Sequence, residues 1–247
     1  MLNRSALTRR RLFACAAVTP LVLRVAIPVA AEASAAERLR EAATAMGELR
    51  SFHFALTTPR GSTTVLNALE LKRLEGDVLR PDRYRATIEA GAAIVTVSID
   101  VIGIGSRLWM SDPTSAEQRF IEVSLSDDVR VDPWFRRLVN PDAFWLALPA
   151  LVSDPVAIGE NRIDGAPVSR IDGTIDLARI FAAVGGEVPG FANAEPLPVS
   201  VWLTPENRLR RLELEGAVVA GEDSTIIRRL DITAYDEPVT IEPPPAA

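Results

Sequence analysis

Alternating apolar and polar residues follow the first fifty positions and predict β-strands. From Ser51 onward, Phe52, Phe54 and Leu56 fall on one side of the segment, whereas His53 falls on the other. Short runs of this kind recur between turn residues, as is typical of an antiparallel meander. The predicted strands, about ten in one sheet, are 51–57, 65–71, 84–90, 94–101, 108–110, 119–123, 156–158, 168–171, 198–203, 209–219 and 226–235. Turns are predicted at 76–77, 81–82, 91, 103–106, 112–113 and 164–165.

Three segments have helical periodicity instead. The first runs from Ser34 to Leu49, with apolar residues at three- and four-residue spacing. The second begins at Asn140-Pro141-Asp142, which provides an N-cap, a first-turn proline and an acid, and it ends before Pro155. A third, shorter helix follows Thr174 and stops at Gly185. The three apolar stripes are Leu39, Ala42, Ala43, Met46 and Leu49; then Phe144, Leu148 and Leu151; and finally Leu177, Ile180, Phe181 and Val184.

The balance of strands and helices predicts an α+β fold and suggests a binding function. A sheet of about ten strands has more apolar surface than three modest helices cover. If the sheet curves into a half-barrel with the helices on its concave face, an apolar cavity for an acyl chain remains between them. A tightly packed core without a cavity fits the pattern equally well. We therefore expect a large curved antiparallel sheet, with helices on the concave face enclosing an apolar cavity.

The N-terminus has the order of an export signal. Arg9-Arg10-Arg11 precedes an apolar run at 14–23, and the small residues Ala33-Ser34-Ala35 follow at a plausible cleavage site. The apolar run is about half as long as a membrane-spanning helix requires. Thr8 to Phe13 fits a twin-arginine signal, with a general secretory signal as the alternative. The expected organisation is a signal peptide at 1–35, one lipid-binding half-barrel domain at 36–237 and a proline-rich tail at 238–247.

Cys15 is the only cysteine, so the chain contains no internal disulfide. It precedes the apolar run, whereas the acylated cysteine of a lipoprotein follows that run. This position argues against lipid anchoring at Cys15. The protein is therefore expected to be exported to the cell envelope or periplasm, or secreted, without that anchor.

Charge and residue types favour no catalytic or nucleic-acid-binding class. The formal net charge is -6 with a pI near 5.0, and the basic residues are scattered rather than clustered. His53 is the only histidine, and no nucleophile-elbow motif accompanies it. We predict no catalytic residue, no metal site and no cofactor.

Several strand-and-turn segments resemble one known family. They are Gly76 to Arg83, Leu108 to Met110, Ile163 to Gly165 with Arg170 to Gly173, and Val199 to Leu203 with Leu209 to Arg211. Together they are similar to the LppX/LprG-type lipoprotein family over most of the mature chain. The resemblance implies a half-barrel enclosing a hydrophobic cavity, and a protein that carries lipids or lipoglycans across the cell envelope. Family members are usually tethered through a cysteine placed after the apolar run, and this sequence has none there.

These considerations predict non-catalytic binding and transport or chaperoning of a lipid or glycolipid. Peripheral contact with a membrane or a membrane transporter fits such a role. The alternative is an envelope regulatory or interaction module that senses lipid or binds a partner protein. The expected cavity lining is Val97, Ile99, Leu108, Trp109, Met110, Phe144, Trp145, Leu148, Val199 and Val201. The sequence leaves open which face of the strands is concave.

Overall fold

In the computed structural model the chain divides into two compact units, Met1–Glu32 and Ala33–Ala247. The structure describes residues 33–65, 69–92, 95–115, 119–123, 151–176, 178–179, 195–218 and 222–245, all in the second unit. The predicted export signal up to residue 32, including Cys15, therefore lies outside the described residues. So do most of the predicted second and third helices, with Phe144, Trp145 and Leu148 among them.

Helix α1 (Ala35–Glu48) confirms the first predicted helix. Ser34 is its N-cap, and a capping box with Glu37 satisfies backbone N–H groups at both positions. At the other end, Nη1 of Arg80 donates to the carbonyl oxygens of Met46, Gly47 and Leu49, each at 2.7 Å. A cation at this position satisfies carbonyls that the helix leaves unpaired and complements the helix dipole.

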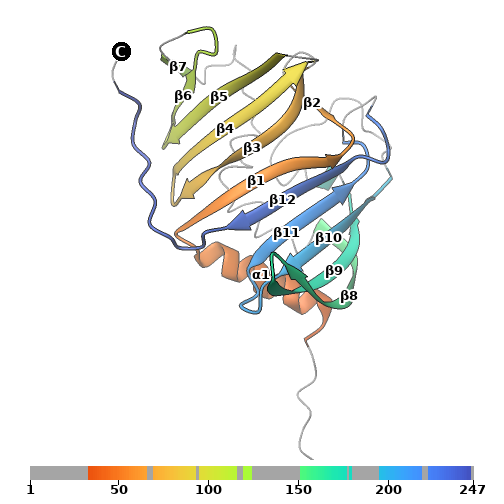
Figure 1. Ribbon diagram of the computed structural model, residues 1–247. Coiled ribbons are helices and arrows are strands. Elements are labelled where there is room, and N and C mark those ends of the chain that lie inside the picture. The colour runs from red at the N-terminus through yellow and green to blue at the C-terminus, as the bar shows by residue number, and fades with distance from the viewer. Residues whose placement is uncertain are drawn as a thin grey trace, which may run out of the picture. The chain divides into compact units, whose positions relative to one another are not determined.

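The strands form one open antiparallel sheet (Figure 1). The first half runs outward from its centre as β1, β3, β4, β5, β6 and β7, with β2 paired to β3. These strands are β1 (Ser51–Arg60), β2 (Thr63–Val65), β3 (Leu69–Leu79), β4 (Arg83–Ala92), β5 (Val95–Ile104), β6 (Arg107–Ser111) and β7 (Phe120–Val123). Apart from β2, which pairs only with β3, each strand in this half lies beside the next strand in the sequence. The predicted meander is therefore confirmed.

The second half continues the sheet from β12 to β8. Its strands are β8 (Val152–Ile163), β9 (Ala166–Ile175), β10 (Leu197–Leu203), β11 (Leu209–Glu215) and β12 (Ile227–Thr233). The two meanders meet where β1 pairs with β12, for example at Phe54 and Ile232. The sheet thus joins residues from the N-terminal and C-terminal parts of the second unit, and β7 and β8 are its edges among the described strands.

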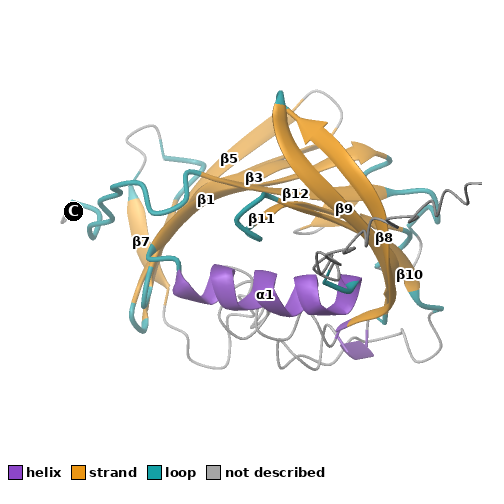
Figure 2. Ribbon diagram, turned by 90° about the horizontal axis from the view of Figure 1, so that it is seen from below, coloured by secondary structure: helices purple, strands orange, loops and turns teal. Residues whose placement is uncertain are grey.

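Helix α1 lies across one face of the bent sheet, as Figure 2 shows. We call this the α1 face and the opposite one the outer face. Along β1, Phe52 and Phe54 are buried on the α1 face, and His53 lies between them on the outer face. Arg38 of α1 donates to the Ser169 hydroxyl on β9. The main core therefore lies between α1 and the sheet, as the alternation in β1 predicted. That several helices enclose a cavity on the concave face stays a prediction.

The C-terminal chain passes the ends of the central strands instead of leaving the domain at once. Asp236 accepts a hydrogen bond from the Arg50 backbone at 2.7 Å, and the Arg83 guanidinium donates to the Ile241 carbonyl at 2.9 Å. Ile241 is buried. The first part of the segment predicted as a proline-rich tail is therefore packed against the domain.

Some predicted boundaries are wrong. Gly76, Gly91 and Gly103 lie inside β3, β4 and β5, not in turns. They permit close approaches within the sheet: a Cβ on Gly103 would lie 2.2 Å from the Tyr84 ring. The predicted strand 65–71 is divided between β2 and β3. Strand β8 begins at Val152, before the Pro155 at which the second helix was expected to end.

Candidate apolar binding face

Apolar side chains on the α1 face line up from strand to strand. Leu56 of β1 lies opposite Leu74 of β3 on one side and Leu230 of β12 on the other. The same register continues outward in both directions through directly opposed pairs. We call the resulting set the apolar row; it consists of Ile99, Ile88, Leu74, Leu56, Leu230, Leu212, Val201 and Ile171. It crosses eight adjacent strands without a polar residue.

Burial varies along this row. Leu74, Val201 and Ile171 are buried in the main core. Ile99, Ile88, Leu56, Leu230 and Leu212 pack against that core but keep part of their surface accessible. Leu214, one residue pair farther along β11, is also only partly buried. The α1 face therefore has a band of large aliphatic side chains that the protein does not completely cover.

Burial on the α1 face also changes along individual strands, as the surroundings of α1 show. Its buried residues include Leu39 and Met46, and its C-terminal end is held by Arg80, next to the start of β1. Near that end of the sheet Phe52, Val78 and Leu108 are almost completely buried. On β1 and β6, the partly exposed Leu56 and Met110 lie farther along the same strands. Burial on β1 and β6 is thus more complete at Phe52 and Leu108 than at Leu56 and Met110.

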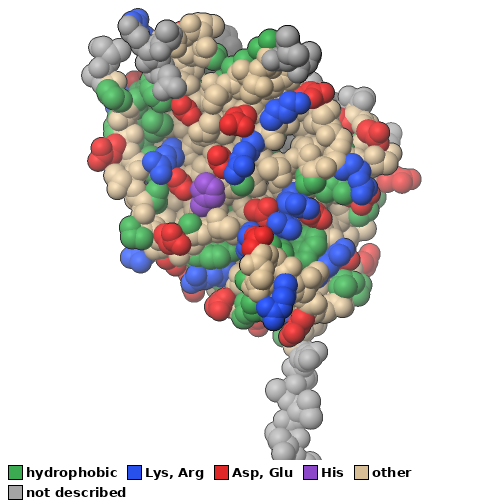
Figure 3. Space-filling view, viewed as in Figure 1, with side chains coloured by type: hydrophobic (Ala, Val, Ile, Leu, Met, Phe, Trp, Pro, Cys, Tyr) green, Lys and Arg blue, Asp and Glu red, His purple; other side chains and the backbone are tan. Residues whose placement is uncertain are grey.

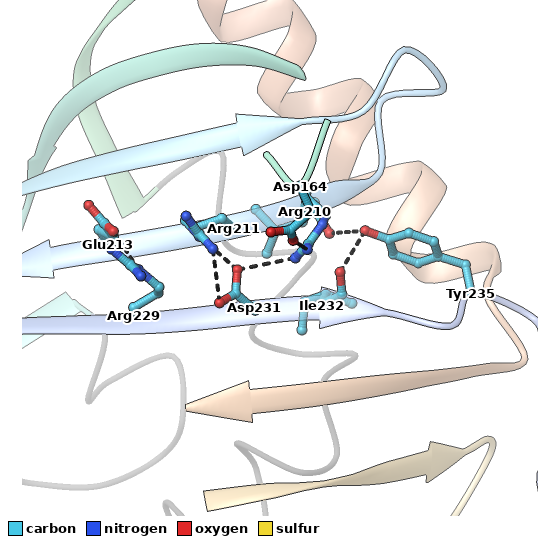
Figure 4. Close-up of polar contacts among 9 residues, drawn as sticks. Asp164, Arg210, Arg211, Glu213, Arg229, Asp231, Ile232 and Tyr235 are labelled. Carbon is cyan, nitrogen blue, oxygen red and sulfur yellow. Dashed lines mark hydrogen bonds and ion pairs between the residues drawn. The ribbon is translucent and has the colours of Figure 1, made fainter. Parts of the chain in front are cut away.

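The outer face has the opposite character. Figure 3 shows side chains of both charges interspersed over it, together with the single histidine. In the centre, Asp231 accepts hydrogen bonds from Arg210 at 3.1 Å and Arg211 at 2.7 Å, beside the pair of Arg229 with Glu213 (Figure 4). Opposite charges on neighbouring strands stabilise a solvent-facing sheet surface. This face is a network of paired charges, not a basic patch.

His53 belongs to the same outer network. Its Nδ1 lies 2.9 Å from Oδ1 of Asp77, whose other oxygen accepts from Arg85 at 2.7 Å. Burial would raise the pKa of Asp77, but the hydrogen bonds from His53 and Arg85 outweigh it and the pKa is lowered. The histidine therefore contacts carboxylates of a cross-strand charge network. Among the described residues, no group of three or more His, Cys, Asp or Glu side chains could hold a metal ion.

Comparison with known proteins adds to this geometry. A profile of the LppX_LprAFG lipoproteins matches residues 33–241. The chain belongs to the LppX_LprAFG lipoprotein family. The resemblance found in the sequence is thereby confirmed, over a stretch that includes every described helix and strand.

Two solved structures of mycobacterial proteins share the fold. LprF from Mycobacterium bovis is similar with a TM-score of 0.60 and 19% identity, over 86% of this chain and 97% of that one. Lipoprotein LppX from Mycobacterium tuberculosis gives a TM-score of 0.55 and 19% identity, over 84% of this chain and 98% of that one. A search of curated protein sequences gave no match. At this identity the likeness concerns the fold alone.

The LppX_LprAFG fold brings six of the predicted lining residues onto one face. Strand alternation places Val97 and Ile99 of β5, Leu108 and Met110 of β6, and Val199 and Val201 of β10 on the α1 face. Val97, Ile99 and Met110 are partly accessible, whereas Leu108, Val199 and Val201 are buried. These six residues therefore share one face of the sheet, and that they line a cavity stays a prediction.

Trp109 does not join this group. It lies between Leu108 and Met110 on β6, so its side chain is on the outer face. There the Arg107 guanidinium lies 4.5 Å from the Trp109 ring centroid and also donates to Glu122 at 2.8 Å. Because neighbouring residues on a strand face opposite ways, Trp109 cannot line a surface formed by Leu108 and Met110.

Sequence reasoning missed the central members of the apolar row. Leu56, Ile88, Leu212 and Leu230 all lie on predicted strands, but alternation within each strand gives no register between strands. Their alignment depends on β1 pairing with β12, two strands that are far apart in the sequence.

In the described part of the chain, the structure contains no helix long and apolar enough to cross a membrane.

Proposed function

We propose that this LppX_LprAFG protein binds the acyl part of a lipid or glycolipid against the apolar row and carries it in the cell envelope. The observation that supports this is the band of partly exposed aliphatic residues on the α1 face. Water contact with such side chains is unfavourable, and a contiguous apolar surface of this kind is typical of a binding site.

In this proposal the bent sheet is the wall of an apolar cavity, with helices on its concave side. The proposed lining consists of the apolar row together with Val97, Leu108, Met110, Phe144, Trp145, Leu148 and Val199. The buried members would contact a ligand only after a rearrangement. Trp109 is left out because of its place on the outer face.

Hydrophobic burial has the magnitude that such a carrier needs. Each methylene group removed from water contributes about 0.8 kcal/mol. A long acyl chain therefore gains enough free energy to leave a membrane only if most of its length is covered. Binding by burial is also reversible, since no bond is made or broken, so we propose a carrier or chaperone and not an enzyme.

The same proposal accounts for the outer face. Its charges are paired with one another, as at Asp231 and at Asp77, and this favours an aqueous compartment over nucleic acid or lipid contact. We propose that the protein is exported to the envelope, and that it meets its donor or acceptor, a membrane or a membrane transporter, transiently at the surface.

The test is native mass spectrometry of the protein, expressed as the full chain and purified from an envelope fraction without detergent. The proposal expects adducts of lipid mass that disappear when the protein is denatured, with the lipid recovered in the extract. The control is the Leu230→Arg variant, which places a charge in the apolar row and should lose the adduct. A lipid-free wild-type protein that also takes up no added phospholipid or glycolipid would contradict the proposal.

A further inference from the structure

Arg228 places a charged side chain on the α1 face of the sheet. It lies two residues before Leu230 and four before Ile232 on β12. Every second residue of a strand faces the same way, so the three side chains lie on the same face. Ile232 is buried in the core, and Leu230 belongs to the apolar row. On β11 its register partner is Leu214, which is partly buried. A guanidinium group therefore stands immediately beside the proposed lipid-binding surface.

The terminal nitrogens of Arg228 hold the loop between β11 and β12. Nη1 donates to the Gly216 carbonyl at 2.9 Å, and Nη2 donates to Oε1 of Glu222. The other carboxylate oxygen of Glu222 accepts from the Val218 backbone at 2.9 Å. The side chains are only 10% exposed for Arg228 and 5% for Glu222. The pair is thus a buried, electrically neutral clamp on this loop.

The clamp leaves one donor unused. Nε of Arg228 is buried and has no hydrogen-bond partner among the residues that the structure describes. A buried N–H without an acceptor is destabilising, and native proteins seldom keep one without a reason. The loop contacts use Nη1 and Nη2 alone, so they give no account of Nε. A lysine could form the ion pair with Glu222 without burying this extra donor.

We propose that Nε of Arg228 donates a hydrogen bond to an uncharged oxygen of the bound lipid, such as an acyl ester carbonyl. This inference rests on the proposed function, because the ligand must lie on the apolar row beside Leu230. An acyl ester has its carbonyl at the end of the apolar chain. After a rearrangement that exposes the buried Nε, a chain lying along Leu212 and Leu230 can therefore present that oxygen to Arg228.

Charge balance selects the class of acceptor. Arg228 is already neutralised by Glu222, so a phosphate or carboxylate at this position would leave an uncompensated buried negative charge. An ester carbonyl accepts a hydrogen bond without changing the net charge. The site thus favours neutral acyl esters over anionic head groups.

The experiment compares two glycerolipids of equal chain length, a diester and the corresponding diether, which lacks the carbonyl oxygens. Wild-type protein should bind the diester about tenfold or more tightly, as expected for a buried hydrogen bond from a charged donor. Arg228→Lys keeps the charge beside Glu222 but has no Nε, so it should bind both lipids with the affinity of the diether. Arg211→Lys on the outer face should retain the full preference.

A second variant tests the charge argument. In Glu222→Gln the arginine is no longer neutralised, so the affinity for a dialkyl phosphate of the same chain length should rise about tenfold. No gain for the phosphate would overturn the choice of a neutral acceptor.

Equal binding of diester and diether by the wild type would overturn the hydrogen bond from Nε, even if Arg228→Lys did not fold. A preference that survives in Arg228→Lys would also overturn it. Failure of the wild type to bind either lipid is a different result, because it would remove the proposed function and this anchor together.

Discussion

Replacing Arg80 by methionine should strongly destabilise the domain. Its Nη1 lies 2.7 Å from the carbonyl oxygens of Met46, Gly47 and Leu49, and its guanidinium carbon lies 5.9 Å from the Phe52 ring centroid. Methionine keeps most of the aliphatic stem but removes the charge and the donor. Losing a charged donor shared by three carbonyls should lower the free energy of unfolding by about 3 kcal/mol.

This loss is measurable by urea and thermal unfolding of residues 33–247, followed by tryptophan fluorescence. For a domain of this size it corresponds to a fall in Tm of roughly 6–12 °C. Arg60→Met is the matched control, because Arg60 and Glu215 form an exposed ion pair at 3.7 Å that should contribute less than about 0.5 kcal/mol. If Arg80→Met is no less stable than Arg60→Met, the helix-capping role of Arg80 is wrong.

Three further predictions concern the two faces and the C-terminal segment. Leu230→Trp should fill part of the partly exposed band and reduce lipid adducts in native mass spectrometry, at a cost in stability of about 1–3 kcal/mol; undiminished adducts would count against this face. Trp109→Phe, on the outer face, should leave lipid content unchanged, and a loss would place the ligand elsewhere. Burial raises the pKa of Tyr235 from 10.0 to about 12. The stabilisation that the neutral Tyr235 side chain gives the folded domain is therefore complete below pH 10 and is lost as the pH rises through 12. Tyr235→Phe should lack that loss in alkaline unfolding curves and be about 1 kcal/mol less stable at neutral pH; identical curves would refute this assignment.

The sequence could predict α1, the meander and the buried sides of many strands because each depends on local periodicity. Ser34 marks the start of the helix through its capping box, and Phe52 and Phe54 mark the buried side of β1. Glycines were misinterpreted because the same residue breaks strands in turns and permits close contacts within sheets. Gly103 accommodates the Tyr84 ring from the neighbouring strand, a contact that no local pattern indicates.

Less of the candidate site could be predicted, for a related reason. Val97, Ile99 and Met110 were recognised as apolar members of strands and do share the α1 face. Which of them remain accessible depends on packing between distant parts of the chain, which strand periodicity does not indicate. Arg228 was not recognised, because its burial beside Leu214 follows from long-range pairing and from Glu222 folding back in the loop.

Photocrosslinking with a lipid that carries a diazirine in its acyl chain tests the central claim most directly. Because neighbouring residues on a strand face opposite ways, tandem mass spectrometry can assign each crosslink to a face. We expect labels on Ile99, Leu212 and Leu230, and none on their outer-face neighbours Asp100, Arg211 and Asp231. Labels mainly on the outer-face residues, or equally on both sets, would contradict lipid binding on the apolar row.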